Sequence, residues 1–363
     1  MTRARTNANV TAAVGRNMII NGAMNVAQRS ASVTGIGASA GYFTCDRWQV
    51  AVAASAGRFT MSQTADGPNG ISANCLKLDC TTADTSIAAG EVLLLRQQIE
   101  GQNLQRIGKG VVGAKQITVS FYVKASAAFT FGCELYDTDH NRQITKLYDT
   151  TTDWVRHEIT FPADVDDGSS PFADDNGASL ILEFWLHAGT TYSGGTLNTA
   201  TWANQTAANR AVGIDSFYSS TDNNFFLTGV QMEIGPVATE FEQEHISVTQ
   251  NKCQRYYYKT LAGDNLVYTS SFNVNTTVAA GHVAFPVEMR AAPTALEQSG
   301  TASHYKVAHA ATATACSAVP SFINATTRGA MTNFTCGSGL TAGQGSQHRG
   351  TNSAAFLAWD KEL

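Results

Sequence analysis

Short stretches in which apolar and polar residues alternate recur along most of the chain. Eight of them are RWQVAV (47–52), RFTMSQTA (58–65), CLKLDCTT (75–82), QITVSFYVKAS (116–126), FTFGCELYD (129–137), WVRHEITF (154–161), LILEFWLH (180–187) and FFLTGVQMEI (225–234). β-Branched and aromatic residues at a period of two are typical of strands with one buried face. Gly, Asn, Asp and Ser separate the stretches, so the pattern predicts an antiparallel β-sandwich or jelly roll.

One stretch fits either a helix or a strand. In EVLLLRQQIEGQNLQRI (91–107), Leu95, Ile99 and Gln102 fall near one face of a helix. The run LLLRQQIE within it also fits a buried strand that leads into a short loop. We interpret it as a strand.

A second block of alternation begins after a connector. HISVTQNKCQRYYYK (245–259) predicts a brief helix or a bent link, and LVYTSSF, GHVAFPVEM, HYKVAHA and AAFLAWDKEL alternate beyond it. By contrast, the first 14 residues are polar and aperiodic, which fits either a disordered terminus or an arm that becomes ordered on docking. We therefore expect an N-terminal arm (1–14), a jelly roll (15–245) and a smaller C-terminal β-sandwich domain (246–363).

Composition narrows the choice of partners. Of the 363 residues, 43% are apolar and only 15% are charged, against about 25% charged in typical soluble domains. Surfaces rich in small polar residues suit oligomers and extracellular or virion proteins. The net charge of −5 and the lack of a basic stripe argue against nucleic acid. Residues 15–30 lack the apolar core of a secretory signal, and we expect no membrane insertion.

The seven cysteines form no metal-binding pattern. They include no CxxC pair and no Cys/His cluster at zinc spacing. Most are expected to be small buried hydrophobes. Cys316 and Cys336 could pair if the fold brings their strands together, which spacing alone does not show.

Several phrases, in order, match one family. NMIINGAMNVAQRS, YFTCDRWQV, TGVQMEIGPVATEFEQ, CQRYYYK, FPVEMRAAPT and TNSAAFLAWDKEL span nearly the whole chain. Together they resemble bacteriophage tail-fibre and virion-decoration proteins. The resemblance implies a carbohydrate-binding-module-like jelly roll, a small β-sandwich, a homotrimer, and a location in the virion after synthesis in the bacterial cytoplasm. It also implies that IINGAM forms the first strand, with a turn or bulge at Asn21-Gly22, and that the arm docks on other virion proteins.

Three functions fit these features. The first is a non-enzymatic fibre or appendage that binds host-surface glycans. The second is a head-decorating or structural virion protein with no receptor role, and the third is a glycan-cleaving enzyme. GIGASAG (35–41) is not a dinucleotide loop, and no GxSxG elbow is present. We therefore expect no enzymatic activity and no cofactor, although carboxylates that pair only in space leave no mark in one sequence.

The longest irregular segment, 187–223, supplies the candidate binding residues. Long loops within compact domains are often functional. Aromatic rings and amides suit the CH faces and hydroxyls of sugars. The candidates are Tyr192, Trp202, Asn204, Gln205, Asn209 and Arg210. Aromatics at a subunit interface or over a sandwich edge are the alternative, and the one we favour.

A second loop gathers carboxylates. ADVDDGSSPFADDNG (163–177) contains Asp164, Asp166, Asp167 and Asp174, oxygen ligands of the kind that calcium prefers. The spacing fails the EF-hand pattern because the glycine comes one place early and the bidentate Glu is missing. We favour a solvated acidic loop over a calcium site.

Overall fold

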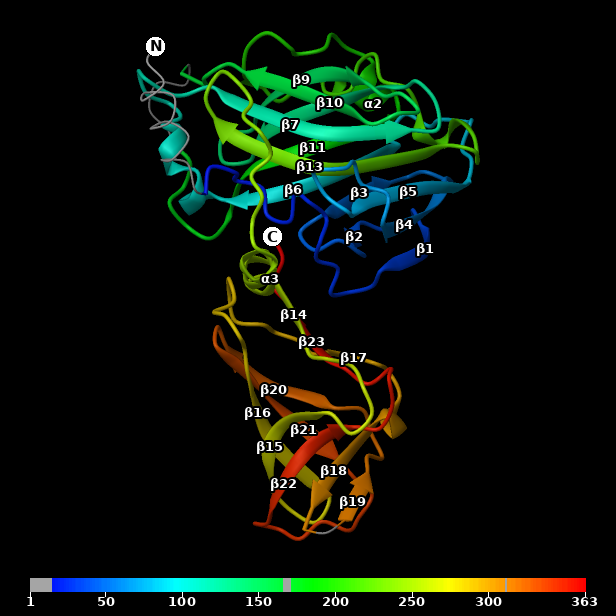
Figure 1. The fold of residues 1–363 in the computed structure, drawn as a ribbon, viewed down its shortest axis with the longest axis vertical. Coiled ribbons are helices and arrows are strands. Elements are labelled where there is room, and N and C mark those ends of the chain that lie inside the picture. The colour runs from blue at the N-terminus through cyan, green and yellow to red at the C-terminus, as the bar shows by residue number, and fades with distance from the viewer. Residues whose placement is uncertain (1–14, 166–170, 311) are drawn as a thin grey trace. The chain divides into compact units, whose positions relative to one another are not determined.

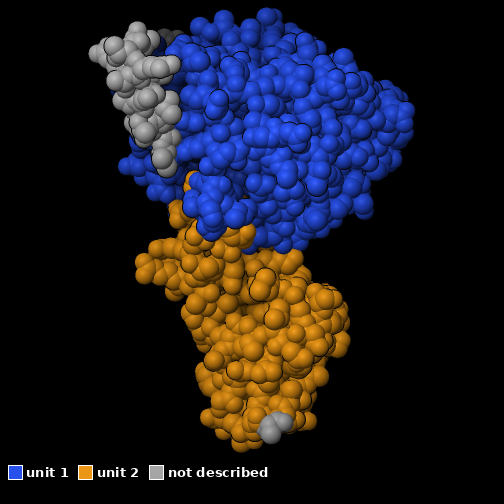
Figure 2. All heavy atoms as spheres, in the orientation of Figure 1, with its two compact units in different colours: residues 1–249, 363 blue, residues 250–362 orange. Residues whose placement is uncertain are grey.

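The computed structural model describes residues 15–165, 171–310 and 312–363. The expected arm, residues 1–14, and Asp166 and Asp167 of the acidic loop lie outside the described residues. The chain divides into two compact units: unit 1 is residues 1–249 with Leu363, and unit 2 is residues 250–362 (Figure 2). Both consist of antiparallel sheets, which confirms the all-β fold class.

Unit 1 contains two sheets that pack face to face (Figure 1). The six-stranded sheet runs β1 (Ser32–Ile36), β4 (Arg58–Thr64), β5 (Cys75–Thr82), β13 (Asn224–Ile234), β7 (Ile117–Ala125), β10 (Val155–Phe161). The seven-stranded sheet runs β12 (Ala203–Asn204), β9 (Arg142–Asp149), β8 (Thr130–Asp137), β11 (Ala178–Ala188), β6 (Val92–Glu100), β3 (Gln49–Ala53), β2 (Gly41–Tyr42). The chain crosses repeatedly from one sheet to the other, as in a jelly roll. The predicted strand within 91–107 is confirmed as β6.

Short helical turns link some of these strands. They are the 3₁₀ turns Gly101–Asn103, Gln105–Ile107, Ala207–Asn209 and Phe217–Ser219, and the single α-turn α2 (Thr190–Ser193).

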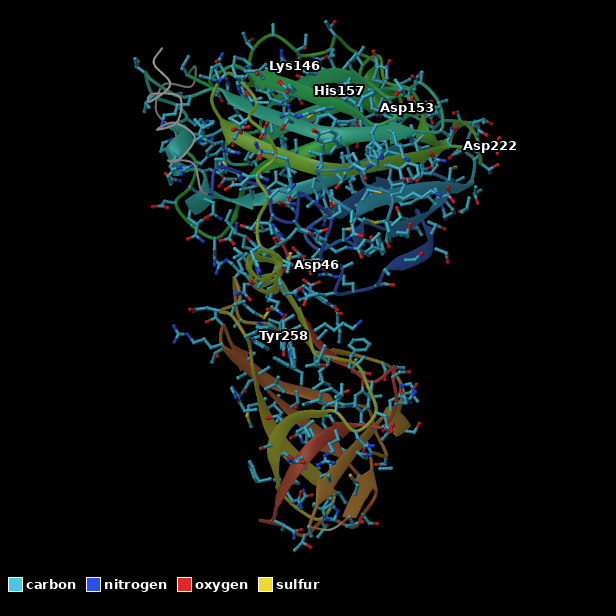
Figure 3. All side chains as sticks on the ribbon, viewed as in Figure 1. Asp46, Lys146, Asp153, His157, Asp222 and Tyr258 are labelled. Carbon is cyan, nitrogen blue, oxygen red and sulfur yellow. The ribbon has the colours of Figure 1, made fainter. Side chains whose placement is uncertain are left out.

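The core of unit 1 lies between the two sheets, where alternate residues of each strand meet. Phe121 of β7 contacts Phe184 of β11 and Tyr148 of β9 edge-on, with both ring centroids 5.0 Å away. His157 of β10, labelled in Figure 3, joins this cluster with its ring 5.5 Å from those of Phe121 and Tyr148. Burial of each large side chain contributes about 1.5–3 kcal/mol, so the period-two pattern directly stabilises the sandwich.

The segment IINGAM is a turn, and the expectation of a first strand there is wrong. Asn21 adopts a positive φ of 58°, and its amide donates to the carbonyls of Val26 and Asp46 at 2.9 and 3.0 Å. A Cβ at Gly22 would lie 2.0 Å from the carbonyl oxygen of Val230. The segment is thus held by side-chain bonds and a close backbone approach instead of a strand ladder, and β1 begins only at Ser32.

Unit 2 contains a three-stranded and a seven-stranded sheet. The first runs β14 (Tyr257–Lys259), β23 (Leu357–Asp360), β17 (Glu297–Gln298). The second runs β19 (Thr312–Ala315), β18 (Tyr305–His309), β22 (Gly345–Gly350), β15 (Val267–Asn273), β16 (Val278–Ala284), β21 (Gly329–Thr335), β20 (Ser321–Thr326). The predicted short helix is confirmed as α3 (Ile246–Gln254), and Ala302–His304 forms a 3₁₀ turn.

One apolar core joins the two sheets of unit 2. Tyr258 of β14, labelled in Figure 3, stacks on Trp359 with ring centroids 6.0 Å apart. Deeper in the seven-stranded sheet, Phe334 stacks on the buried imidazole of His348 at 3.9 Å.

Among the described residues, no helix has the length and apolar character needed to cross a membrane.

Candidate functional site

The segment between β11 and β13 lies over the outer face of the seven-stranded sheet of unit 1. Tyr192 of α2 places its ring 5.5 Å from that of Trp185 on β11. The backbone N–H of Ala211 donates to the carbonyl of Tyr192 at 2.9 Å. Ala211 and Ile214 complete a small apolar cluster with Trp185 on this face. The segment therefore covers part of the outer face of the sheet, and Tyr192 packs there instead of over a sandwich edge. Whether it also lies at a subunit interface stays a prediction.

Arg210 anchors this cover through two buried carboxylates. Its guanidinium donates to Glu134 of β8 at 2.8 Å and to Glu183 of β11 at 2.5 Å. The guanidinium also lies over the rings of Tyr136 and Trp185, 4.8 and 4.9 Å from their centroids. Trp185 Nε1 donates to Glu134 at 2.6 Å. The side chains of Glu134 and Glu183 are almost fully buried, so Arg210 offsets part of the cost of burying their charges.

Burial shifts proton affinities here. Burial raises the pKa of Glu134 well above its usual range, although the Arg210 guanidinium opposes this shift. For Arg210, burial lowers the pKa, but the charges of Glu134 and Glu183 outweigh it and raise the pKa overall.

Arg96 of β6 extends this ion network toward solvent. Its Nη1 lies 3.2 Å from Glu183 Oε1, and its Nε donates to Gln49 Oε1 of β3 at 2.6 Å. Because Glu183 pairs in register with Glu134 on one side and with Arg96 on the other, the polar row crosses four strands. We call Glu134, Glu183, Arg210 and Arg96 together the Glu–Arg network. The Arg96 side chain is 25% exposed, so Arg96 and Gln49 form the solvent edge of the row.

Sequence analysis missed Glu134, Glu183 and Arg96, although a signal was present. Each is a charged residue within an otherwise apolar strand, in FGCELYD, LILEFWLH and LLLRQQIE. The alternation places these residues on the face opposite the core. The order of the strands in the sheet brings the three residues side by side. The spacing of residues along the sequence does not predict that order.

Trp202 does not lie on a surface that could bind sugar. Its side chain is only 6% exposed and belongs to the main core of unit 1. Its Nε1 donates to the carbonyl of Pro162 at 2.8 Å. The proposed role of this ring in stacking on a sugar therefore does not fit its position, because an apolar ring gains more by closing the end of the sandwich.

The three amide candidates have different surroundings: Asn209 bonds within the segment, Gln205 is half-buried and Asn204 is exposed. Asn209 accepts from the backbone N–H of Thr196 at 2.9 Å and so fixes the segment internally. Gln205 is half-buried, and its backbone N–H donates to Asn141 at 2.8 Å. Asn204 on β12 is exposed. The structure thus does not bring the six candidates together into one binding surface.

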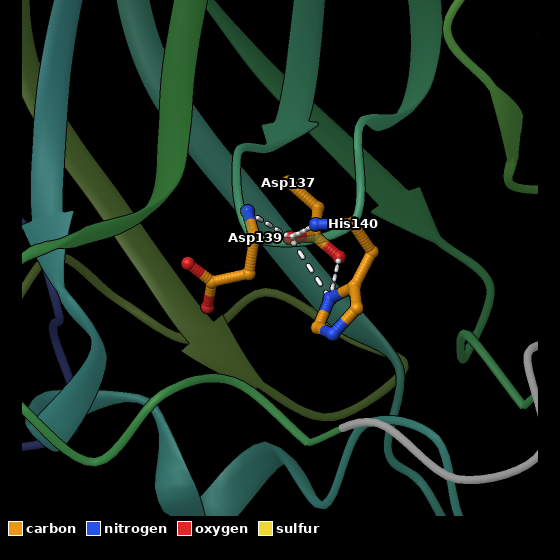
Figure 4. Close-up of side chains that lie close together, drawn as sticks. All are labelled: Asp137, Asp139 and His140. Atoms are coloured by element: carbon orange, nitrogen blue, oxygen red, sulfur yellow. Dashed lines mark hydrogen bonds and ion pairs between the residues drawn. The ribbon is translucent and has the colours of Figure 1, made fainter.

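The carboxylates at one end of the same sheet pair with cations of the chain. Asp137, Asp139 and His140 place possible ligand atoms within 4.8 Å of one another (Figure 4). Lys109, whose side chain is 1% exposed, lies 3.1 Å from Asp137 Oδ2 and 3.1 Å from His140 Nδ1. Its ammonium supplies the positive charge that a metal would bring, so we assign no metal to this cluster.

Of the calcium candidates, Asp164 forms a bidentate pair with Arg142, at 2.9 and 2.7 Å. Asp174 is exposed. A carboxylate whose two oxygens are held by a guanidinium is a poor calcium ligand. For Asp166, Asp167 and Asp174, the interpretation of this segment as a solvated acidic loop without a metal stays a prediction.

No family model matches the chain, and no curated protein matches its sequence. Solved structures to which the chain is similar include a family 4 carbohydrate-binding module (12% identity, TM-score 0.29, covering 59% of this chain and 97% of the module). Others are a family 61 module in complex with β-1,4-galactotriose (11%, 0.29, 61% and 99%) and a family 22 xylan-binding domain from Paenibacillus barcinonensis (12%, 0.28, 62% and 100%). These similarities are too low to assign a ligand.

Proposed function

We propose that the chain is a non-enzymatic fibre or appendage protein of a bacteriophage particle. The order of the family-like phrases supports this assignment, and the two all-β units suit a virion protein. Glu134 and Glu183, two carboxylates that face each other on neighbouring strands, share one guanidinium and are buried. Their arrangement supports a structural role, because glycosidic cleavage needs carboxyl groups that can reach a substrate.

We further propose that the solvent edge of the Glu–Arg network binds host-surface glycans. The observation that supports this role is the partly exposed Arg96, held between Gln49 and the buried Glu183. A guanidinium fixed in this way presents its remaining N–H groups without losing side-chain freedom on binding. Together with the adjacent amide, it can bond the paired hydroxyls of a sugar.

The change Arg96→Ala is expected to weaken adsorption to host cells and binding to isolated host glycan at least about tenfold, the scale of a charge-assisted hydrogen bond. Lys77→Ala is the matched control. Lys77 lies on the six-stranded sheet, has a 26% exposed side chain and pairs with Asp79 at 3.0 Å. Equal binding by the Arg96 and Lys77 variants, with both folded, would remove this surface from the proposal.

The assembly that we propose is a homotrimer, attached to other virion proteins through residues 1–14. Three weak sites on one particle component would together give strong adhesion to repeated glycans. Sedimentation of the purified full chain at micromolar concentration is expected to give three times the monomer mass. A stable monomer under those conditions would contradict the trimer. Labelling that places the chain on the phage head would instead favour the decoration role.

A further inference from the structure

Cys316 and Cys336 lie directly opposite one another in unit 2. Cys316 follows β19 and Cys336 follows β21, and the two residues form an isolated antiparallel bridge. β19 is one edge of the seven-stranded sheet, whereas β21 lies next to the other edge. The bridge therefore joins the two sides of a sheet that has curled toward closure.

Their backbone geometry suits a cross-strand disulfide. The N–H of Cys316 donates to Tyr305, and the N–H of Cys336 donates to Thr277, at 2.9 and 2.7 Å. The bond between the two segments comes from the next residue, Ser317 N–H to the carbonyl of Thr335 at 2.8 Å. The cysteines are thus a non-hydrogen-bonded antiparallel pair, for which Cα atoms lie about 4.5 Å apart, within the range that a disulfide spans.

The two thiols also contact one another. A hydrogen bond between them raises the pKa of Cys316, with burial adding to the shift, and lowers the pKa of Cys336. Their side chains are buried, with 6% and 1% of each residue exposed. The cysteines of β5 differ, because Cys75 contacts the hydroxyl of Thr64 and Cys80 contacts the carbonyl of Thr82.

We propose that Cys316 and Cys336 are a modification site, where a reversible disulfide closes the curled sheet of unit 2 once the protein leaves a reducing cytoplasm. The oxidant is a low-molecular-weight disulfide such as oxidised glutathione. The Cys336 thiolate attacks one of its sulfurs and releases one glutathione thiolate. The Cys316 thiolate then attacks Cys336 Sγ and releases the second. Two protein thiols are oxidised and one disulfide is reduced to two thiols.

The oxidant reaches these sulfurs when β19 opens. This edge strand is four residues long and largely exposed, and such elements open at a small free-energy cost. Once formed, the disulfide would keep β19 attached to β21.

The test uses the full chain equilibrated with oxidised or reduced glutathione, then alkylated and digested with trypsin without reduction. Cleavage after Lys306, Arg328 and Arg349 places the two cysteines on separate peptides, 307–328 and 329–349, each with a single cysteine. We expect these peptides to be joined, about 2 Da lighter than their sum, only after oxidation. Amide exchange of β19 and β21 should also slow roughly a hundredfold on oxidation, the scale of a disulfide that closes a loop of this length.

The control is the double variant Cys75→Ala/Cys80→Ala, which should still give the joined peptides. Cys316→Ala/Cys336→Ala should abolish both the joined peptides and the change in exchange. Should that variant fail to fold, the wild-type peptide map decides alone. Separate, fully alkylated peptides from the oxidised wild type, under conditions where exchange shows that β19 opens, would overturn the proposal.

Discussion

Replacing Arg210 by alanine is expected to destabilise unit 1 by about 3–5 kcal/mol, the usual cost of leaving buried charges without their partner. The variant removes the guanidinium that donates to both Glu134 and Glu183, and it also removes a contact with Trp185. The measurement is amide exchange in β8 and β11 of the full chain, because the two-unit chain need not unfold in one step.

The loss should depend on pH in a defined direction. Glu134 has a folded pKa above its unfolded value, so the folded state takes up its proton first and loses stability as pH rises above about 4.5. Without Arg210 this pKa rises further. The Arg210→Ala variant should therefore be destabilised more at pH 8 than at pH 5.

Arg156→Ala serves as the matched control. Arg156 pairs with Glu158 on the surface of β10, where ion pairs contribute less than about 1 kcal/mol. Similar losses for Arg210→Ala and Arg156→Ala, or a loss independent of pH, would show that the Glu–Arg network does not hold the segment over the sheet.

Period-two alternation located most strands of unit 1 because each strand buries one face in a single core. CLKLDCTT coincides with β5, and RFTMSQTA differs from β4 by one residue. The strand expected at IINGAM came from the family resemblance and not from alternation, which the apolar residues Met18, Ile19 and Ile20 before Asn21 do not show. There, side-chain bonds of Asn21 replace a ladder.

The candidate site was much less predictable than the strands. Trp202 and Arg210 were selected because they lie in a long irregular segment, and irregular backbone does not show whether a side chain faces solvent. In the structure Trp202 enters the core and Arg210 reaches the carboxylates of two strands. The position of each side chain depends on which distant segments pack together. No local sequence pattern predicts that packing. The same limit applied to Cys316 and Cys336, which spacing left undecided and the strand order brings together.

Unit 2 is expected to lose stability between pH 6.5 and pH 4 through His348. Its imidazole is fully buried, stacks on Phe334, and contacts the carbonyl of Ala279 through Nε2 and the hydroxyl of Thr332 through Nδ1. No carboxylate contributes to its shift, and burial lowers the pKa of His348 to about 4. As pH falls below 6.5, His348 of the unfolded chain binds a proton, whereas His348 of the folded unit stays neutral until about pH 4. The contribution is therefore complete above pH 6.5 and lost through this window, by about 3 kcal/mol at 1.36 kcal/mol per pKa unit.

The change His348→Gln keeps a neutral hydrogen-bonding side chain and removes the titration. Amide exchange in β21 and β22, corrected for intrinsic rates, should then show a loss of protection between pH 7 and pH 4 that is smaller than in the wild type by that amount. His282→Gln is the control, because His282 of β16 in the same sheet is exposed and its replacement should leave the wild-type pH dependence intact. An equal acid response in the wild type and the His348 variant would place the acid sensitivity of unit 2 elsewhere. A response confined to the wild type and the His282 variant would assign it to the buried imidazole, because glutamine takes up no proton in the unfolded chain and so adds no acid-dependent loss of stability.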